Sequence, residues 1–249
     1  MAMERYLSQL AVKEIFPTGQ RKIEASSVVV IGMGGTGSSI SEIMVRMGVN
    51  NIRIVDDDTI ETSNLNRQAM YKESDIGLKK VDVARAELLK INESANVEAV
   101  DQRLTFENAE RIFSNATLIM DGTDNYSARN IINVVSSKLN IPWVFSAVEG
   151  TFGYVKAIIP GKTSCMSCFG YPDKGDGVSC TVQGVLPSAV RAVSSLAVTI
   201  ALKVIVGKEN SGDLLFLDVW EPRLERLPIQ RNEECKVCGK KINDDARTT

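Results

Sequence analysis

The chain has 249 residues and a formal net charge of −2, a balance that does not favour non-specific binding to nucleic acid or to an anionic membrane surface. Its 44% of hydrophobic residues is enough for a sizeable core, and no linker rich in proline, glycine or serine divides it, so we expect one domain over residues 1–249. The longest apolar stretch, residues 185–206, is interrupted by Pro187, Arg191 and Lys203, so we expect no membrane span and a cytoplasmic location.

Strands and helices alternate along the first 150 residues. A segment with helical spacing of apolar residues (1–25) comes first, and the β-branched run at 27–31 then predicts a buried parallel strand. Further strands are predicted at 51–56, 97–100, 117–121 and 142–147, and helices at 38–47, 79–92, 107–113 and 127–139. This alternation is typical of an α/β fold with a Rossmann-like, doubly wound, mostly parallel sheet.

The pattern changes after Gly150. Strands are predicted at 151–159, 214–219 and 223–229, and a long helix at 188–206. We expect these C-terminal strands to extend the sheet in the antiparallel direction. The irregular stretch at 162–184 is too long for a passive connection, which indicates a functional loop. The polar residues 243–249 are expected to be frayed.

Four of the five cysteines form two C-x-x-C pairs, Cys165 with Cys168 and Cys235 with Cys238. The two-residue spacer lets both thiolates of a pair face one ion, and two pairs complete the tetrahedron that zinc prefers. The sequence has no histidine, so four thiolates are the only ordinary closed site. Two disulfides or four unrelated core residues are the alternatives, but no secretory signal supports them. We predict a structural zinc clamp between the C-terminal tail and the loop at 162–184.

A glycine-rich turn lies between the first predicted strand and helix. It contains the pattern G-x-G-x-x-G, and its glycines are Gly32, Gly34, Gly35 and Gly37. Glycines at such a turn let the backbone approach a phosphate at the helix N-terminus. Asp56 ends the second predicted strand, the position from which a carboxylate reaches a ribose hydroxyl. These features predict a nucleotide site that suits NAD and ATP equally; a tight turn without a ligand is the alternative.

Charged residues near strand ends distinguish these two nucleotides. Arg67 and Lys80 follow the second strand, and Asp124 follows the fourth. The carboxyl ends of strands line the ligand crevice of a doubly wound sheet, so these side chains can converge on one nucleotide. A triphosphate attacked at its α-phosphorus needs cations and a metal site, whereas hydride transfer from nicotinamide does not. The charges therefore favour ATP, although each residue alone is typical of a solvated surface.

Taken together, the motifs resemble those of the MoeB/ThiF/HesA family, adenylyltransferases that activate ubiquitin-like sulfur carriers and are related to ubiquitin-activating enzymes. The resemblance covers residues 5–239, and its motifs are the glycine loop, DDDT at 56–59, SNLNRQ at 63–68, GLKKV at 77–81, DGTDN at 121–125, SC at 179–180 before GV at 184–185, and the two C-x-x-C pairs. It implies that ATP and Mg²⁺ activate the C-terminal glycine carboxylate of a small β-grasp carrier ending in Gly-Gly as an acyl adenylate. It also implies a nucleotide-binding half at 26–150 and a carrier-binding half, with the zinc site, at 151–242.

Family membership implies roles for single residues. By similarity, Asp56 would hold the ribose, Asp58 would contact the nucleotide and Asp124 would hold Mg²⁺. The residues implied to bind the phosphates are Asn64, Arg67 and Lys80. Cys180 would take the acyl group as a thioester or join an acyl disulfide during sulfur transfer. The alternative is that a separate persulfide donor delivers the sulfur and that Cys180 is dispensable.

One motif departs from the family pattern. R-Y-x-R-Q reads Arg5-Tyr-Leu-Ser8-Gln here, so a serine replaces the second arginine. In relatives that arginine reaches across a dimer, and a homodimer is implied here too. We hypothesise that Arg5 or Lys13 fills the gap. Two other functions stay open, an NAD-dependent oxidoreductase and a non-catalytic partner subunit, and the sequence does not distinguish molybdopterin, thiamine, tRNA thiolation and protein conjugation pathways.

Overall fold

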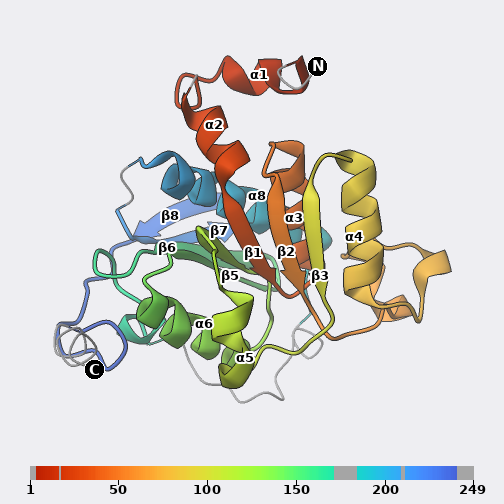
Figure 1. Ribbon diagram of the computed structural model, residues 1–249. Coiled ribbons are helices and arrows are strands. Elements are labelled where there is room, and N and C mark those ends of the chain that lie inside the picture. Colours follow the sequence, from red (N-terminus) through yellow and green to blue (C-terminus); the bar gives the residue numbers. More distant parts are fainter. Residues whose placement is uncertain (1–3, 17, 171–183, 209–210, 240–249) are drawn as a thin grey trace.

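The computed structural model describes residues 4–16, 18–170, 184–208 and 211–239, and its centre is one eight-stranded sheet (Figure 1). The strand order is β3-β2-β1-β4-β5-β6-β7-β8. The strands are β1 (Ser27–Ile31), β2 (Asn51–Val55), β3 (Asn96–Val100), β4 (Leu118–Asp121), β5 (Trp143–Glu149), β6 (Phe152–Ile158), β7 (Leu214–Asp218) and β8 (Arg223–Leu227). Each was predicted from the sequence, with ends that differ by at most two residues.

Parallel and antiparallel pairing divide this sheet into two parts. The strands from β3 to β5 pair in parallel, with Val30 opposite Ile54 on one side and Met120 on the other. The strands from β5 to β8 pair antiparallel, with Phe145 opposite Lys156. The predicted fold class, a parallel core extended by antiparallel C-terminal strands, is confirmed. Because β1 lies between β2 and β4, connections leave it in both directions, and a crevice forms at the carboxyl ends of these strands.

Helices cover both faces of the sheet (Figure 1). One face packs against α3 (Gly35–Arg46), α4 (Lys80–Ile91) and α8 (Pro187–Val206), and the other against α5 (Phe106–Ile112) and α6 (Tyr126–Leu139). Alternate side chains of β1 enter these two layers, which is why the strand is apolar on both faces. The remaining helical segments are η1 (Glu4–Tyr6), α1 (Leu7–Leu10), α2 (Thr18–Ala25), η2 (Thr62–Asn64), η3 (Glu73–Asp75) and η4 (Met166–Cys168).

The start of α3 is the one helix boundary that differs clearly from its prediction. The helix begins at Gly35, three residues before the predicted start at Ser38, and Gly34 is its N-cap in an extended conformation. The glycine-rich turn therefore passes straight into the helix. The first free N–H groups of α3 belong to the loop itself, which places them at the crevice.

Among the described residues, α8 is the one helix long and apolar enough to cross a membrane by length and composition, which the sequence analysis did not expect. Pro187 does not interrupt it, because proline at the first helical position loses no hydrogen bond. The helix packs against α3, β5 and β6, and Val193, Ala197 and Ala201 are fully buried there. Packing in the core accounts for its apolar composition.

Candidate functional site

A pocket of about 860 Å³ opens at the carboxyl ends of β1, β2, β4 and β5. The predicted site residues that line it are Gly32, Gly34, Gly35, Asp56, Asp58, Asn64, Arg67, Lys80 and Asp124. Gly37 does not line the pocket, and Cys180 lies outside the described residues. The fold thus brings most of the predicted nucleotide residues, from segments far apart in sequence, to one place.

The glycines of the loop have different roles. A Cβ on Gly37 would lie 1.8 Å from the carbonyl oxygen of Gly32, and one on Gly122 would lie 2.6 Å from Cα of Gly37. These three glycines therefore allow the loops after β1 and β4 to touch. A Cβ on Gly34 would meet only a side-chain atom, at 3.6 Å. Gly37 therefore packs loops together, whereas Gly34 leaves the helix N-terminus open; the predicted approach of Gly37 to a phosphate stays a prediction.

The N-terminus of α3 has the properties of an anion site. Its N-cap is a glycine, so no side chain covers the first N–H groups, and the helix dipole favours negative charge there. Gln68, which is 4% exposed, lines the same pocket, and its Oε1 has no hydrogen-bond partner among the described residues. Buried polar atoms are nearly always paired, so this amide fits a ligand that supplies the missing donor. Gln68 was not among the predicted site residues.

Asp56 is fixed by the backbone around it. Its Oδ2 accepts a hydrogen bond from Met33 N at 2.6 Å, and its Oδ1 accepts one from Asp58 N at 2.8 Å. Burial raises the pKa of Asp56, against the Lys80 ammonium and these two hydrogen bonds. Asp56 follows β2 rather than ending it, and each carboxylate oxygen keeps a lone pair for a ribose hydroxyl.

Lys80, at the start of α4, is a buried cation on the pocket wall. Its Nζ lies 2.7 Å from Asp58 Oδ2, and the side chains are 7% and 65% exposed, respectively. An exposed carboxylate is easily displaced, so a phosphate could take its place beside the ammonium. The wall behind Lys80 is held by Tyr71, whose hydroxyl donates to Met33 O at 2.7 Å, and burial raises the pKa of Tyr71 so that it stays a donor. Tyr71 was not among the predicted site residues.

Asn64 and Arg67 come from the loop between β2 and α4. Asn64 Oδ1 accepts from Glu61 N at 3.0 Å and so closes the turn of η2. Arg67 Nη1 donates to Ser63 O at 2.8 Å and to the side chain of Asn66. In the described part of the chain, Arg67 forms no ion pair. Its guanidinium charge is therefore available to an anion in the pocket.

Under the pocket lies a buried ion pair that the sequence analysis did not identify. Arg129 Nε and Asp121 Oδ2 are 2.9 Å apart, and Arg129 Nη2 donates to Thr123 O at 2.6 Å and to Ser146 O at 3.0 Å. Arg129 thus fixes the loop that carries Asp124. The sequence did contain a signal for this pair, because Arg129 is a charged residue on the apolar side of the predicted helix, three residues before Ile132.

Asp124 is exposed at the pocket rim, next to Asn125, whose side chain caps α6 by accepting from Ala128 N at 2.9 Å. Its carboxylate could hold a divalent cation, and the carboxylates of Asp56, Asp57 and Asp58 lie within 4.8 Å of one another at the end of β2. Oxygen ligands of this kind suit Mg²⁺.

The pocket continues as an apolar arm over the antiparallel strands. Its lining residues there include Phe145, Phe152, Tyr154, Phe169 and Leu214. The rings of Phe145 and Phe169 meet edge to face at 5.5 Å, and Trp143 meets Phe145 in the same way at 6.1 Å. The Arg129 guanidinium lies 5.4 Å from the Phe145 centroid. One cavity therefore joins a charged end, suited to phosphates, to an aromatic channel.

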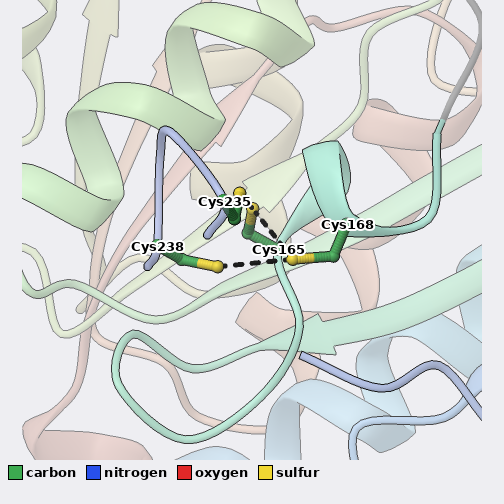
Figure 2. A group of neighbouring side chains, drawn as sticks. All are labelled: Cys165, Cys168, Cys235 and Cys238. Carbon is green, nitrogen blue, oxygen red and sulfur yellow. Dashed lines mark hydrogen bonds between the residues drawn. The ribbon is translucent and has the colours of Figure 1, made fainter. Parts of the chain in front are cut away.

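The four paired cysteines form a second site (Figure 2). Their sulfurs lie within 4.8 Å of one another, with Cys165 3.6 Å from Cys235, and Cys168 3.4 Å from Cys238. These distances are far too long for disulfides, which excludes that alternative. Four sulfurs at about 2.3 Å from a tetrahedral zinc ion are roughly 3.8 Å apart. The observed spacing is close to that value, so the cluster fits the ion.

Both cysteine turns are held by one face of α6. Asn133 Oδ1 accepts from Met166 N at 3.0 Å, and its Nδ2 donates to Ser167 Oγ at 3.1 Å, within the first turn. Four residues later, Ser137 Oγ donates to Val237 O at 2.9 Å in the second turn. The turns are therefore arranged by contacts that do not depend on an ion.

The acidity of the thiols also fits a cation site. Burial and the neighbouring thiols raise the pKa of Cys165, and burial likewise raises that of Cys168. Burial also opposes ionisation of Cys235, but hydrogen bonds from Cys238 and Val237 N–H outweigh it and lower the pKa to about 7. Burial therefore opposes the charged form of two of these thiols, and a bound divalent metal would supply the positive charge that stabilises several thiolates together.

The N-terminal residues give no direct replacement for the arginine absent at Ser8. Arg5 Nη1 donates to Ile91 O at 2.7 Å, at the end of α4 of the same chain, and Lys13 is exposed. The hypothesis that either residue reaches a neighbouring subunit stays a prediction.

Comparisons with known proteins agree with this geometry. The ThiF family matches residues 6–237. A sulfur carrier protein ThiS adenylyltransferase of Bacillus subtilis is 34% identical over 241 residues, covering 95% of this chain and 72% of the relative. A sulfur carrier protein adenylyltransferase of Thermus thermophilus is 35% identical over 246 residues, covering 95% and 91%. A solved structure of Escherichia coli MccB with MccA-N7isoASN shares the fold at a TM-score of 0.79 and 22% identity, covering 89% of this chain and 69% of that one. The chain therefore belongs to the ThiF family.

Proposed function

We propose that this protein uses ATP to adenylate the C-terminal glycine carboxylate of a small β-grasp sulfur-carrier protein, with release of pyrophosphate. The observation that carries the proposal is the continuity of the pocket, which joins an anion site at α3 to an aromatic channel. The charged end suits a triphosphate, and the channel suits an extended peptide tail that must bring its carboxylate to the α-phosphorus. The names of the relatives from Bacillus subtilis and Thermus thermophilus support the same reaction.

In the proposed reaction a carboxylate oxygen of the carrier attacks the α-phosphorus, and the bond to the β-phosphate bridging oxygen breaks. Asp56 would hold the ribose, with Asp58 beside it. The side chains that would hold and screen the phosphates are Asn64, Arg67 and Lys80. Mg²⁺, when bound at Asp124, would screen further phosphate charge. Because an anion attacks an anionic chain, most of the rate enhancement would come from positioning and charge screening.

The fate of the acyl adenylate is a separate part of the proposal. The thiolate of Cys180 would attack the acyl carbon and expel AMP, leaving a thioester; alternatively, a persulfide donor would attack and form an acyl disulfide. Gly170 and Val185, the nearest pocket residues before and after the segment that contains Cys180, support the first route because both line the pocket. We further propose that the cysteine cluster holds a structural zinc ion and that the protein acts as a homodimer.

The test is ATP–pyrophosphate exchange in the presence of candidate carriers ending in Gly-Gly. Exchange should depend on the carrier and disappear when its last two glycines are deleted, because the shortened tail no longer reaches the charged end of the pocket. Cys180→Ala should retain exchange but lose any thiol-labile conjugate. Absence of exchange with carriers of the thiamine, molybdopterin and protein-conjugation types would refute the proposed activity.

A further inference from the structure

Lys156 is a buried lysine that forms no ion pair with another described residue. It lies within β6 and is 0% exposed. Its Nζ donates to the carbonyl oxygen of Gly212, and it takes part in none of the ion pairs formed within the described ranges. A carbonyl supplies a dipole but no countercharge, and an isolated buried charge is costly. A buried lysine here therefore lowers stability unless another group offsets its charge.

The side chain of Lys156 lies in the layer that contains the cysteines. Side chains alternate along β6, and Val155 and Ala157 belong to the apolar cluster under α3 and α8. Ile158, two residues after Lys156, belongs to the opposite cluster, together with Cys165, Cys235 and Cys238. Lys156 therefore shares the cysteine-bearing face of the sheet with Ile158.

The neighbour of Lys156 in β5 contacts the segment that carries Cys168. Lys156 is opposite Phe145 in the sheet, and Phe145 contacts the ring of Phe169, the residue after Cys168.

The thiolates also act on this ammonium electrostatically. Burial lowers the pKa of Lys156 to about 8, while the Asp213 carboxylate acts most strongly in the opposite direction, followed by Cys168 and Cys165. Four thiolates around a divalent ion carry a net charge of about −2, so a loaded site would present more negative charge to Lys156 than the free thiols do. The Lys156 ammonium would then offset part of the negative charge of the loaded site.

We propose that Lys156 is a positioning residue of the four-cysteine site, whose buried ammonium offsets the negative charge of the metal tetrathiolate. The proposal rests on the proposed zinc site and adds to it a residue outside the two C-x-x-C pairs. The alternative is that Lys156 acts only as the hydrogen-bond donor to the Gly212 carbonyl. In that case its charge would not affect metal affinity.

The test compares the zinc affinity of the purified parent protein with that of its Lys156 variants, measured by competition with a chromogenic chelator. Lys156→Met and Lys156→Gln should both bind zinc about 10–100-fold more weakly, the scale for groups that support metal ligands. Lys162→Met, which removes an exposed lysine from the same loop, should bind zinc as the parent does. With Co²⁺ as probe, the thiolate-to-metal absorption of both Lys156 variants should saturate at correspondingly higher metal concentrations.

Thermal stability with and without zinc distinguishes charge compensation by Lys156 from a purely structural role of this residue. Metal-free Lys156→Met should unfold at a higher temperature than the metal-free parent, because an uncompensated buried charge is gone, and it should gain less from added zinc. Parent-like zinc affinity in both variants would overturn the proposal. Weaker zinc binding in Lys156→Met alone would also overturn it, because glutamine can still donate a hydrogen bond and the effect would then come from that bond and not from the charge. If the methionine variant does not fold, Lys156→Arg must keep parent affinity. A parent protein that binds no zinc would instead overturn the zinc site itself.

Discussion

Replacing Arg129 by methionine should destabilise the protein strongly, because it leaves a buried carboxylate without a countercharge. Arg129 and Asp121 are 2.9 Å apart, with side-chain exposures of 5% and 0%. Breaking a buried pair by removing one partner costs about 3–5 kcal/mol, and here the two carbonyls that accept from Arg129 lose their donor as well. At ~1.4 kcal/mol per tenfold change, a loss of about 4 kcal/mol lowers the folding equilibrium constant roughly 10³-fold.

The same helix offers a matched control. Lys138 and Glu110 form an ion pair at 2.7 Å, but their side chains are 67% and 52% exposed. Exposed pairs contribute about 0–1 kcal/mol, so Lys138→Met should have little effect on the free energy of unfolding. Urea denaturation followed by circular dichroism measures both variants. Adding Asp121→Asn to Arg129→Met should recover part of the loss, since it removes the orphaned charge.

Two results would refute this reasoning. One is a loss for Arg129→Met that lies within about 1 kcal/mol of that for Lys138→Met, which would mean that water or other groups solvate the carboxylate. The other is a double variant less stable than Arg129→Met alone, which would mean that packing, not charge, carries the effect.

Three further predictions concern the pocket and the cysteines. Gly37→Ala should abolish or severely reduce folding, because its Cβ would lie 1.8 Å from a carbonyl oxygen, whereas Gly34→Ala should keep a parent-like melting temperature and weaken ATP binding. Lys80→Met should reduce carrier-dependent pyrophosphate exchange about 10²-fold or more, while Lys79→Met, at the adjacent half-buried lysine, should retain it; equal losses would contradict the role of the buried cation. Metal removal by a chelator should lower the melting temperature and speed tryptic cleavage after Arg231, which mass spectrometry would detect; unchanged cleavage would show that the clamp does not hold the tail.

Strand positions could be predicted closely because their sequence signal is local. β1 is buried on both faces and therefore apolar at nearly every position, and glycines and charges mark its end. The nucleotide pocket could be predicted for a similar reason, since strand ends place Asp56 and Asp124 on one edge of the sheet. The cysteine cluster followed from spacing alone, although 66 residues separate Cys168 from Cys235 in the sequence.

The residues that were missed act through contacts that no local pattern records. Gly37 carries the same signature as Gly34, and only the close approach of the Gly32 carbonyl and of Gly122 in another loop separates their roles. Arg129 lies on the apolar side of its helix, but only the position of Asp121 beneath it shows which group it pairs with. Tyr71 bonds a backbone carbonyl 38 residues away, a pairing that depends on the whole β1–α3 turn.

The edge-to-face contact between Trp143 and Phe145 makes the protein its own fluorescent probe. The sequence has two tryptophans, and Trp143 is fully buried whereas Trp220 is 70% exposed. Trp220→Phe would leave one emitting indole, in contact with a ring that also touches Arg129 and Phe169. Changes at the pocket floor should alter its emission, so nucleotide and carrier binding can be followed in stopped-flow experiments without an attached dye.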